Sequence, residues 1–183
     1  MRIIVGITGA SGAVYGIRLL EELKARGVET HLIVSKWAEK TLEYEMEMTR
    51  EEAASLSEVC YDVDDLAAAV SSGSFRCDGM VIAPCSMKTL ASIAGGCADN
   101  LIARAADVTL KERRRLILVP RESPLSLIHV RNMLTVTEAG AILVPPTPAF
   151  YTKPETLDDF VDQVVSRVMD MLDIPNELTT RWG

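Results

Sequence analysis

Short runs of apolar residues alternate along this chain with longer stretches in which apolar positions recur at helical spacing. The continuous runs, rich in β-branched residues, predict buried strands at 2–7, 30–34, 59–62, 79–83, 116–119 and 141–144. The amphipathic stretches predict helices at 12–26, 36–47, 86–95, 100–113, 126–139 and 157–172. Thr49 and Glu52 form a capping-box pattern that predicts one more short helix.

Strands that are apolar throughout and separated by helices predict a parallel sheet covered on both faces. The sequence shows no linker, repeat or low-complexity segment. We therefore expect an α/β fold, a single doubly wound domain over residues 1–183 with a mainly parallel sheet. Ligands of such folds bind beyond the carboxyl ends of the strands, so the segments that follow strands are the candidates for chemistry.

Charge and composition exclude several classes of function. Lysine and arginine number 19 and aspartate and glutamate 26, so the net charge of −7 disfavours nucleic acid and anionic membranes as partners. The glycine-rich start is unlike a signal peptide and no apolar run is long enough for a membrane span, so we expect a cytoplasmic protein. Two histidines and four cysteines without a CxxC pair predict buried free thiols and no metal site.

The first candidate segment, residues 8–12, reads Thr-Gly-Ala-Ser-Gly between the first strand and the first helix. Its glycines allow a tight turn, and the helix that follows offers free N–H groups to a phosphate, with the Ser11 hydroxyl as a further donor. The segment lacks the lysine of a P-loop and the spacing of GxGxxG. A plain turn with Ser11 as the N-cap is the alternative.

Two further segments follow strands. Ser86 and Thr89 can donate to a phosphate or a flavin ring, or Ser86 can simply cap its helix, while Cys85 fits packing better than nucleophilic chemistry. Arg121 and Glu122 stand between prolines at the next strand end. Arg121 can fork onto a phosphate and Glu122 can act as general acid or base, or the two form an ion pair at the rim.

Several cations and one aromatic residue complete the candidates. Arg104 lies in an apolar helical stretch, where a guanidinium needs a partner or an anionic ligand, and Lys111 shares its helix face. The arginines at 113–115 fit partners of the helix dipole on a wet surface. Tyr151 follows a proline-rich strand end, and Arg167 on the last helix can face the same region.

Taken together, these motifs resemble a known family. The matching stretches are 8–12, 15–20, 84–89, 99–108, 110–113, 119–122, 128–129, 132–133, 148–151 and 181–183. They span nearly the whole chain and resemble the flavin prenyltransferases of the UbiX/Pad family, once called aromatic acid decarboxylases. The resemblance implies a flavodoxin-like fold and a homododecamer built from trimers, with sites at subunit interfaces.

The resemblance also implies an activity. Such enzymes join the dimethylallyl group of dimethylallyl monophosphate to N5 and C6 of reduced flavin mononucleotide (FMN), without a metal. The prenylated FMN then serves a partner decarboxylase of the UbiD family.

Carried onto this sequence, the resemblance assigns roles to individual residues. The flavin nucleotide is expected to be held by Gly9, Ala10, Ser11, Ser35, Ser86, Met87, Lys88, Thr89 and Arg121. The prenyl phosphate is expected to be bound by Arg104, Lys111, Arg121, Tyr151 and Arg167. The expected catalytic residues are Ser11 and Glu45 near flavin N5, Lys111, and Glu122 as the acid that protonates the departing phosphate.

Two alternatives share much of this pattern. One is a flavoprotein decarboxylase of peptidyl-cysteine or phosphopantothenoylcysteine, but such enzymes use a histidine near the end of the first helix. The nearest histidine here, His31, falls in a predicted strand. The other is an FMN-binding accessory subunit of a hydroxyarylic acid decarboxylase, which binds flavin without prenylating it.

Overall fold

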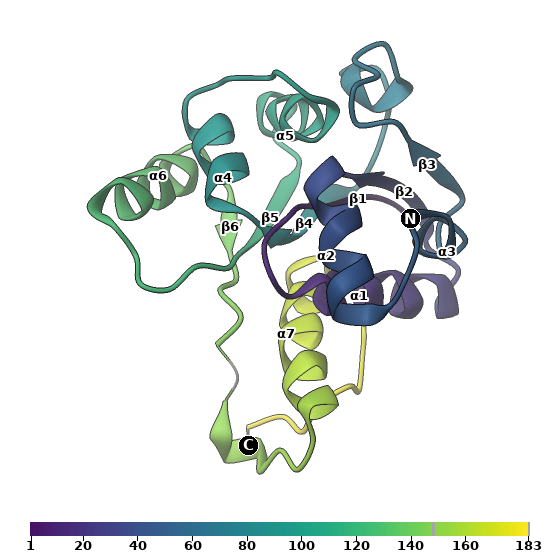
Figure 1. Cartoon of the computed structure of the whole chain (residues 1–183), viewed down its shortest axis with the longest axis vertical. Coiled ribbons are helices and arrows are strands. Elements are labelled where there is room, and N and C mark those ends of the chain that lie inside the picture. Colours follow the sequence, from purple (N-terminus) through teal and green to yellow (C-terminus); the bar gives the residue numbers. More distant parts are fainter. Residues whose placement is uncertain (148, 183) are drawn as a thin grey trace.

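The computed structural model describes residues 1–147 and 149–182, so Pro148 and Gly183, each part of a matching stretch, lie outside the described residues. Six strands form one parallel sheet in the order β3-β2-β1-β4-β5-β6 (Figure 1). They are β1 (Arg2–Ile7), β2 (Glu29–Val34), β3 (Val59–Tyr61), β4 (Gly79–Cys85), β5 (Arg115–Pro120) and β6 (Ile142–Leu143). The predicted doubly wound α/β fold is confirmed, and every described pair of neighbouring strands is parallel.

Helices connect the strands and cover both faces of the sheet (Figure 1). The α-helices are α1 (Ala13–Ala25), α2 (Lys36–Met46), α3 (Arg50–Ala54), α4 (Met87–Ala94), α5 (Leu101–Lys111), α6 (Leu127–Glu138) and α7 (Leu157–Met171). Two short 3₁₀ turns, η1 (Ala69–Ser71) and η2 (Phe150–Thr152), lie in the connections. Among the described residues, no helix is both long and apolar enough to cross a bilayer.

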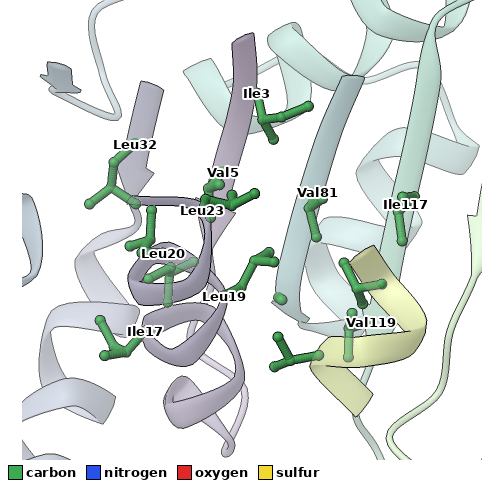
Figure 2. Packing of buried hydrophobic residues seen from close by; sticks show 14 of the residues in the cluster. Ile3, Val5, Ile17, Leu19, Leu20, Leu23, Leu32, Val81, Ile117 and Val119 are labelled. Atoms are coloured by element: carbon green, nitrogen blue, oxygen red, sulfur yellow. The ribbon is translucent and has the colours of Figure 1, made fainter. Parts of the chain in front are cut away.

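The core consists of two hydrophobic clusters, one on each face of the sheet. Side chains of α1 and α7 pack on one face, where Leu20 and Leu23 of α1 belong to the same cluster as Val5 and Val81 of the sheet (Figure 2). Side chains of α4, α5 and α6 belong to the cluster on the other face, together with Ile4. Because successive strand residues point to opposite faces and both faces are buried, the strands are apolar throughout.

Two strands extend further at their carboxyl ends than predicted, because proline does not end them. β4 continues through Pro84 to Cys85, and β5 ends at Pro120 itself. Proline removes one N–H donor but leaves the chain extended, so the ladder skips Ala83 and Pro84 and resumes where Cys85 pairs with Pro120. The last strand is shorter than the predicted 141–144, whereas the predicted capping box at Thr49 and Glu52 is confirmed.

The strand order places the turning point of the fold at β1. From β1 the chain moves to β2 and β3 on one side, then crosses back to β4, β5 and β6 on the other. The carboxyl ends of β1 and β4 therefore lie side by side with their helices leading away in opposite directions. In open α/β sheets this crevice is where ligands bind.

Candidate functional site

A cavity of about 600 Å³ lies at this crevice, beyond the carboxyl ends of β1, β2 and β4. Five residues that the sequence analysis selected for flavin binding line it together: Gly9, Ser35, Ser86, Lys88 and Thr89. They come from three segments that are far apart in the sequence, each directly after a strand. The structure therefore brings these predicted residues to one place.

Three helices begin at the wall of this cavity. Ser35, Ser86 and Asn100 are the N-caps of α2, α4 and α5, and each accepts a hydrogen bond from a backbone N–H of its own first turn. Helix N-termini carry partial positive charge, and the ends of three helices meet here. The cavity is thus suited to an anionic group such as a phosphate.

One hydroxyl in the first turn of α4, that of Thr89, remains able to donate to a ligand. The Ser86 hydroxyl accepts from the Thr89 N–H at 3.3 Å and donates to the Thr89 Oγ1 at 3.1 Å. The cap that the sequence offered as the simpler explanation is therefore present. It leaves the Thr89 proton for an acceptor in the cavity, so capping and ligand binding are compatible at this segment.

Thr8 ties the ends of β1 and β4 together beneath the cavity, a role that the sequence analysis missed. Its buried hydroxyl donates to the Pro84 carbonyl at 2.7 Å and accepts from the Ser86 N–H at 2.8 Å. This pair of bonds fixes the start of the Ser86 connection. The signal in the sequence that could have revealed this role is a threonine directly after a buried strand.

We expect Thr8→Val to destabilise the fold by about 1–3 kcal/mol and to weaken flavin binding, because the Ser86 N–H loses its buried acceptor. Thr109→Val is the matched control, since the Thr109 hydroxyl is equally buried but donates to Ala105 O inside α5. Urea unfolding and flavin titration measure the two effects. Equal flavin affinity in both variants would contradict a role for Thr8 at the site.

The segment 8–12 differs from the prediction. The N–H groups of Gly12 and Ala13 at the start of α1 are not free, because both donate to Glu45 Oε2, at 2.8 and 3.1 Å. The N-cap is Gly12, whose φ of 104° favours glycine, so Ser11 does not cap this helix. The carboxylate of Glu45 occupies the positive helix end that was expected to bind phosphate.

These two bonds place the Glu45 carboxylate beside the loop that contains Ser11. Gly9 has a separate constraint, because an added Cβ would lie 2.4 Å from the Trp37 Cβ. Ala10 belongs to the same loop, and Met87 is the first residue of α4, but the cavity wall among the described residues does not include them.

A second cavity, of about 380 Å³, lies between the end of β6 and α7. Tyr151 and Arg167 both line it, so the structure brings these two predicted substrate residues together. The ring of Trp182 packs edge-on against the Tyr151 ring, with 4.9 Å between centroids. This cavity has an aromatic wall and a cation.

Arg104 and Lys111 lie elsewhere, on α5. The Arg104 guanidinium binds Asp107 at 2.7 Å and the Ser71 carbonyl at 3.2 Å, and Lys111 forms an ion pair with Glu112. Neither residue lines the two cavities described above. Figure 1 shows α5 at one end of the long axis and the C-terminal segment at the other.

Arg104 and Lys111 of α5 lie beside the loop at residues 71–75, which contains none of the predicted site residues. Ser72 and Ser74 of this loop bond to each other through their hydroxyls at 2.9 Å. Arg114 also serves this loop by donating to the carbonyls of Gly73 and Phe75 at 2.8 and 2.7 Å, which corrects its assignment to a wet surface. The serine-rich composition of residues 71–74 was the signal in the sequence that could have drawn attention to this loop.

Arg121 and Glu122 follow β5, next to the Ser86 connection, and both are exposed. The Arg121 N–H donates to the Cys85 carbonyl at 3.2 Å, and Glu122 Oε1 accepts from the Ser123 N–H at 3.0 Å. The rim ion pair between them, which was the alternative interpretation, is absent from the ion pairs of the described residues. The Arg121 charge lies near Tyr15, whose pKa is raised by burial and partly lowered again by Arg121.

The four cysteines differ in their surroundings. Burial raises the pKa of the Cys85 thiol to about 12, which keeps it protonated and confirms its role in packing. All four cysteines are free, but only Cys85 is buried: Cys60 and Cys77 are half-buried and Cys97 is exposed, so the prediction of buried thiols is right for Cys85 alone. Within residues 1–147 and 149–182 no group of three metal-ligating side chains gathers.

Comparison with known proteins extends over the whole chain. Residues 1–169 match the model of the Flavoprotein family. A probable UbiX-like flavin prenyltransferase of Streptomyces sp. (strain D7) is 57% identical, over 100% of this chain and 92% of the relative. Flavin prenyltransferase UbiX of Thauera aromatica is 51% identical, over 100% and 94%.

Solved structures agree with these relatives. AnUbiX (PadA1), in complex with FMN and dimethylallyl pyrophosphate, matches with a TM-score of 0.98 and 53% identity, over 100% of this chain and 97% of that one. A dodecameric FMN-dependent UbiX-like decarboxylase from Escherichia coli O157:H7 matches with a TM-score of 0.98 and 52% identity over both full chains.

The alternative among cysteine decarboxylases is similar in fold alone. Peptidyl-cysteine decarboxylase EpiD matches with a TM-score of 0.67 at 15% identity, covering 93% of this chain and 97% of that one. Identity above 50% over the full length is found with the UbiX-like flavin prenyltransferases instead. The chain therefore belongs to the Flavoprotein family and, within it, to the UbiX-like flavin prenyltransferases.

Proposed function

We propose that this protein transfers the dimethylallyl group of dimethylallyl monophosphate to N5 and C6 of reduced FMN. The observation that carries the proposal is the cavity where the N-termini of α2, α4 and α5 meet, in a chain whose relatives are flavin prenyltransferases. A solved neighbour that is 53% identical is in complex with FMN and dimethylallyl pyrophosphate.

The residues at the first cavity suit FMN. Three helix N-termini and the hydroxyl of Thr89 favour a phosphate, and Gly9 keeps the backbone open where a side chain would collide with Trp37. When bound, reduced FMN supplies the electron-rich N5 and C6 that receive the prenyl group. We assign its binding to Gly9, Ala10, Ser11, Ser35, Ser86, Met87, Lys88, Thr89 and Arg121.

The chain's own residues provide what departure of the phosphate requires. Phosphate is a poor leaving group, so cations that stabilise its developing charge and an acid that protonates it lower the barrier. We assign the charge stabilisation to Arg104, Lys111, Arg121 and Arg167, and the proton to Glu122. Tyr151 contributes a hydroxyl for the phosphate and a ring face for the allyl cation. Ser11 and Glu45 handle protons near N5.

A site that contains all the residues assigned to the prenyl phosphate needs more than one copy of the chain. Tyr151 and Arg167 line one cavity, whereas Arg104 and Lys111 lie on α5 towards the other end of the long axis (Figure 1). A second copy can bring its α5 cations to the Tyr151 cavity of the first. We infer a homododecamer built from trimers, which the dodecameric E. coli neighbour supports.

Helix α6 offers a surface for this assembly. It packs against α4 at the outer margin of the molecule, and directly follows the connection that contains Arg121 and Glu122 (Figure 1). Five apolar side chains on and before it are exposed: Leu125, Leu127, Ile128, Val130 and Leu134. A monomer rarely exposes several large apolar side chains along one short segment, and a second copy seated on them would shield Glu122 from water.

We also propose that the product serves a decarboxylase of the UbiD family and that the protein works in the cytoplasm. Prenylated FMN requires an acceptor enzyme, because the chemistry assigned here ends with the modified flavin. Four free cysteines support a reducing compartment.

The assay that tests the proposed function supplies reduced FMN and dimethylallyl monophosphate to the purified protein without oxygen. Mass spectrometry is expected to show that flavin gains one five-carbon unit, and parallel reactions with the pyrophosphate show which phosphate is used. Flavin that binds but never gains this mass would favour the accessory-subunit alternative. Decarboxylation of a cysteinyl substrate would favour the alternative of a peptidyl-cysteine or phosphopantothenoylcysteine decarboxylase.

A further inference from the structure

The carboxylate of Asp170 near the end of α7 is shared by two arginines. Arg181 donates from Nη1 to Oδ2 at 2.6 Å and from Nη2 to Oδ1 at 2.8 Å. Arg167 donates from Nη1 to the same Oδ2 at 2.9 Å. The Arg181 guanidinium holds the pKa of Asp170 below its usual range, so the group of three carries one net positive charge at neutral pH.

The same carboxylate anchors the C-terminal segment 176–182 to α7. Asn176 donates to Asp170 Oδ1 at 3.2 Å and accepts from the fully buried Ser166 hydroxyl at 2.7 Å. Arg181 also donates to the Asn176 carbonyl at 3.2 Å. Asn176 and Arg181, near the two ends of the segment, are therefore both bound to Asp170.

The anchored segment reaches the second cavity. Thr179 lines that cavity together with Tyr151 and Arg167, and Trp182 packs edge-on against the Tyr151 ring. The aromatic wall of the cavity therefore depends on a residue adjacent to Arg181, while its cation, Arg167, shares the carboxylate that Arg181 binds. The position of Trp182 and the charge of Arg167 therefore both depend on the Asp170–Arg181 ion pair.

We propose that Asp170 and Arg181 are positioning residues for the prenyl phosphate, an inference that rests on the proposed function. An arginine paired with one aspartate is neutral as a pair and attracts a phosphate weakly. Because Arg181 binds Asp170 with two hydrogen bonds, the single bond from Arg167 can be released and its charge turned to the anion. The same pair holds Trp182 beside Tyr151, where the apolar prenyl group would lie.

The first test compares Arg181→Gln with wild type in the flavin-loaded protein. We expect the KM for dimethylallyl monophosphate to rise about tenfold, the scale of one hydrogen bond to a charged group, with flavin affinity changed less than about twofold. Arg181→Lys should recover part of the loss, because it restores the charge without the bidentate geometry. Arg115→Gln is the matched control, since Arg115 pairs with Asp173 just beyond the same helix and lines neither cavity.

The second test separates charge from structure with inorganic phosphate as the probe, titrated calorimetrically into the flavin-loaded protein. Arg181→Gln should weaken phosphate binding about tenfold, and adding Asp170→Asn should restore most of it, because Arg167 then has no carboxylate to neutralise. Unchanged phosphate binding in Arg181→Gln, or a double variant weaker than the single one, would overturn the proposal. Because this titration needs no turnover, a wild-type protein that fails to prenylate flavin counts against the proposed function alone.

Discussion

Replacing Glu122 with glutamine is expected to leave flavin binding nearly unchanged and to slow prenyl transfer by about 10²–10⁴-fold. An amide has nearly the shape of the carboxyl group but cannot give a proton to the departing phosphate. The Glu122 side chain is exposed and its described hydrogen bond is local, to the Ser123 N–H, so the change should not disturb the fold. Single-turnover rates under anaerobic conditions measure the effect.

Glu138→Gln provides the control for this prediction. Glu138 is also an exposed glutamate, at the last position of α6, so the same chemical change is made away from the strand ends. Normal transfer by the Glu138 variant together with slow transfer by the Glu122 variant would support the acid role. If Glu122→Gln turns over at the wild-type rate, another group must protonate the phosphate.

The second large effect concerns assembly. Ile128→Asp is expected to dissociate the oligomer and to lower prenyl transfer by about 10²–10³-fold, as when a group that stabilises transition-state charge is lost. The Ile128 side chain is 68% exposed in the single chain, so a charge there should leave the protomer folded while opposing burial against a second copy. Sedimentation velocity measures the assembly, and circular dichroism checks the fold.

Two variants serve as controls for the Ile128 experiment. Ile128→Leu keeps the surface apolar and should preserve both assembly and activity. Leu157→Asp places the same charge on another exposed leucine, at the start of α7, and tests whether the effect is specific to α6. An Ile128→Asp protein that remains fully assembled and active would exclude this face of α6 from the interface.

The local pattern of the sequence was sufficient for most of the fold. Strands buried on both faces must be apolar throughout, and helices that cover them must be apolar on one side, so both appear as distinct periodicities. The errors occurred where one residue was given too much weight. Pro84 and Pro120 were expected to lie beyond the ends of their strands, although proline in an extended segment removes only a hydrogen bond.

Individual residues of the candidate site could be predicted from the sequence, but their spatial arrangement around one cavity could not. Ser86 could be recognised because it stands just before a helix, whereas Ser35, in the same position before α2, was assigned through the resemblance, and Asn100 before α5 was not selected. That all three line one cavity depends on the strand order, which no local pattern contains. The binding of Glu45 to the start of α1 is likewise a contact between residues far apart in the sequence.

The sequence by itself determined the alternation of strands and helices, the residues with chemical capacity and the family to which they belong. The tertiary structure decided which side chains meet: Ser86 with Thr8, Tyr151 with Arg167 at one cavity, and Asp170 with both Arg167 and Arg181. It also separated Arg104 and Lys111 from the cavity they were expected to share. The physical reason is that hydrophobic periodicity is local, whereas strand order and packing bring distant segments together.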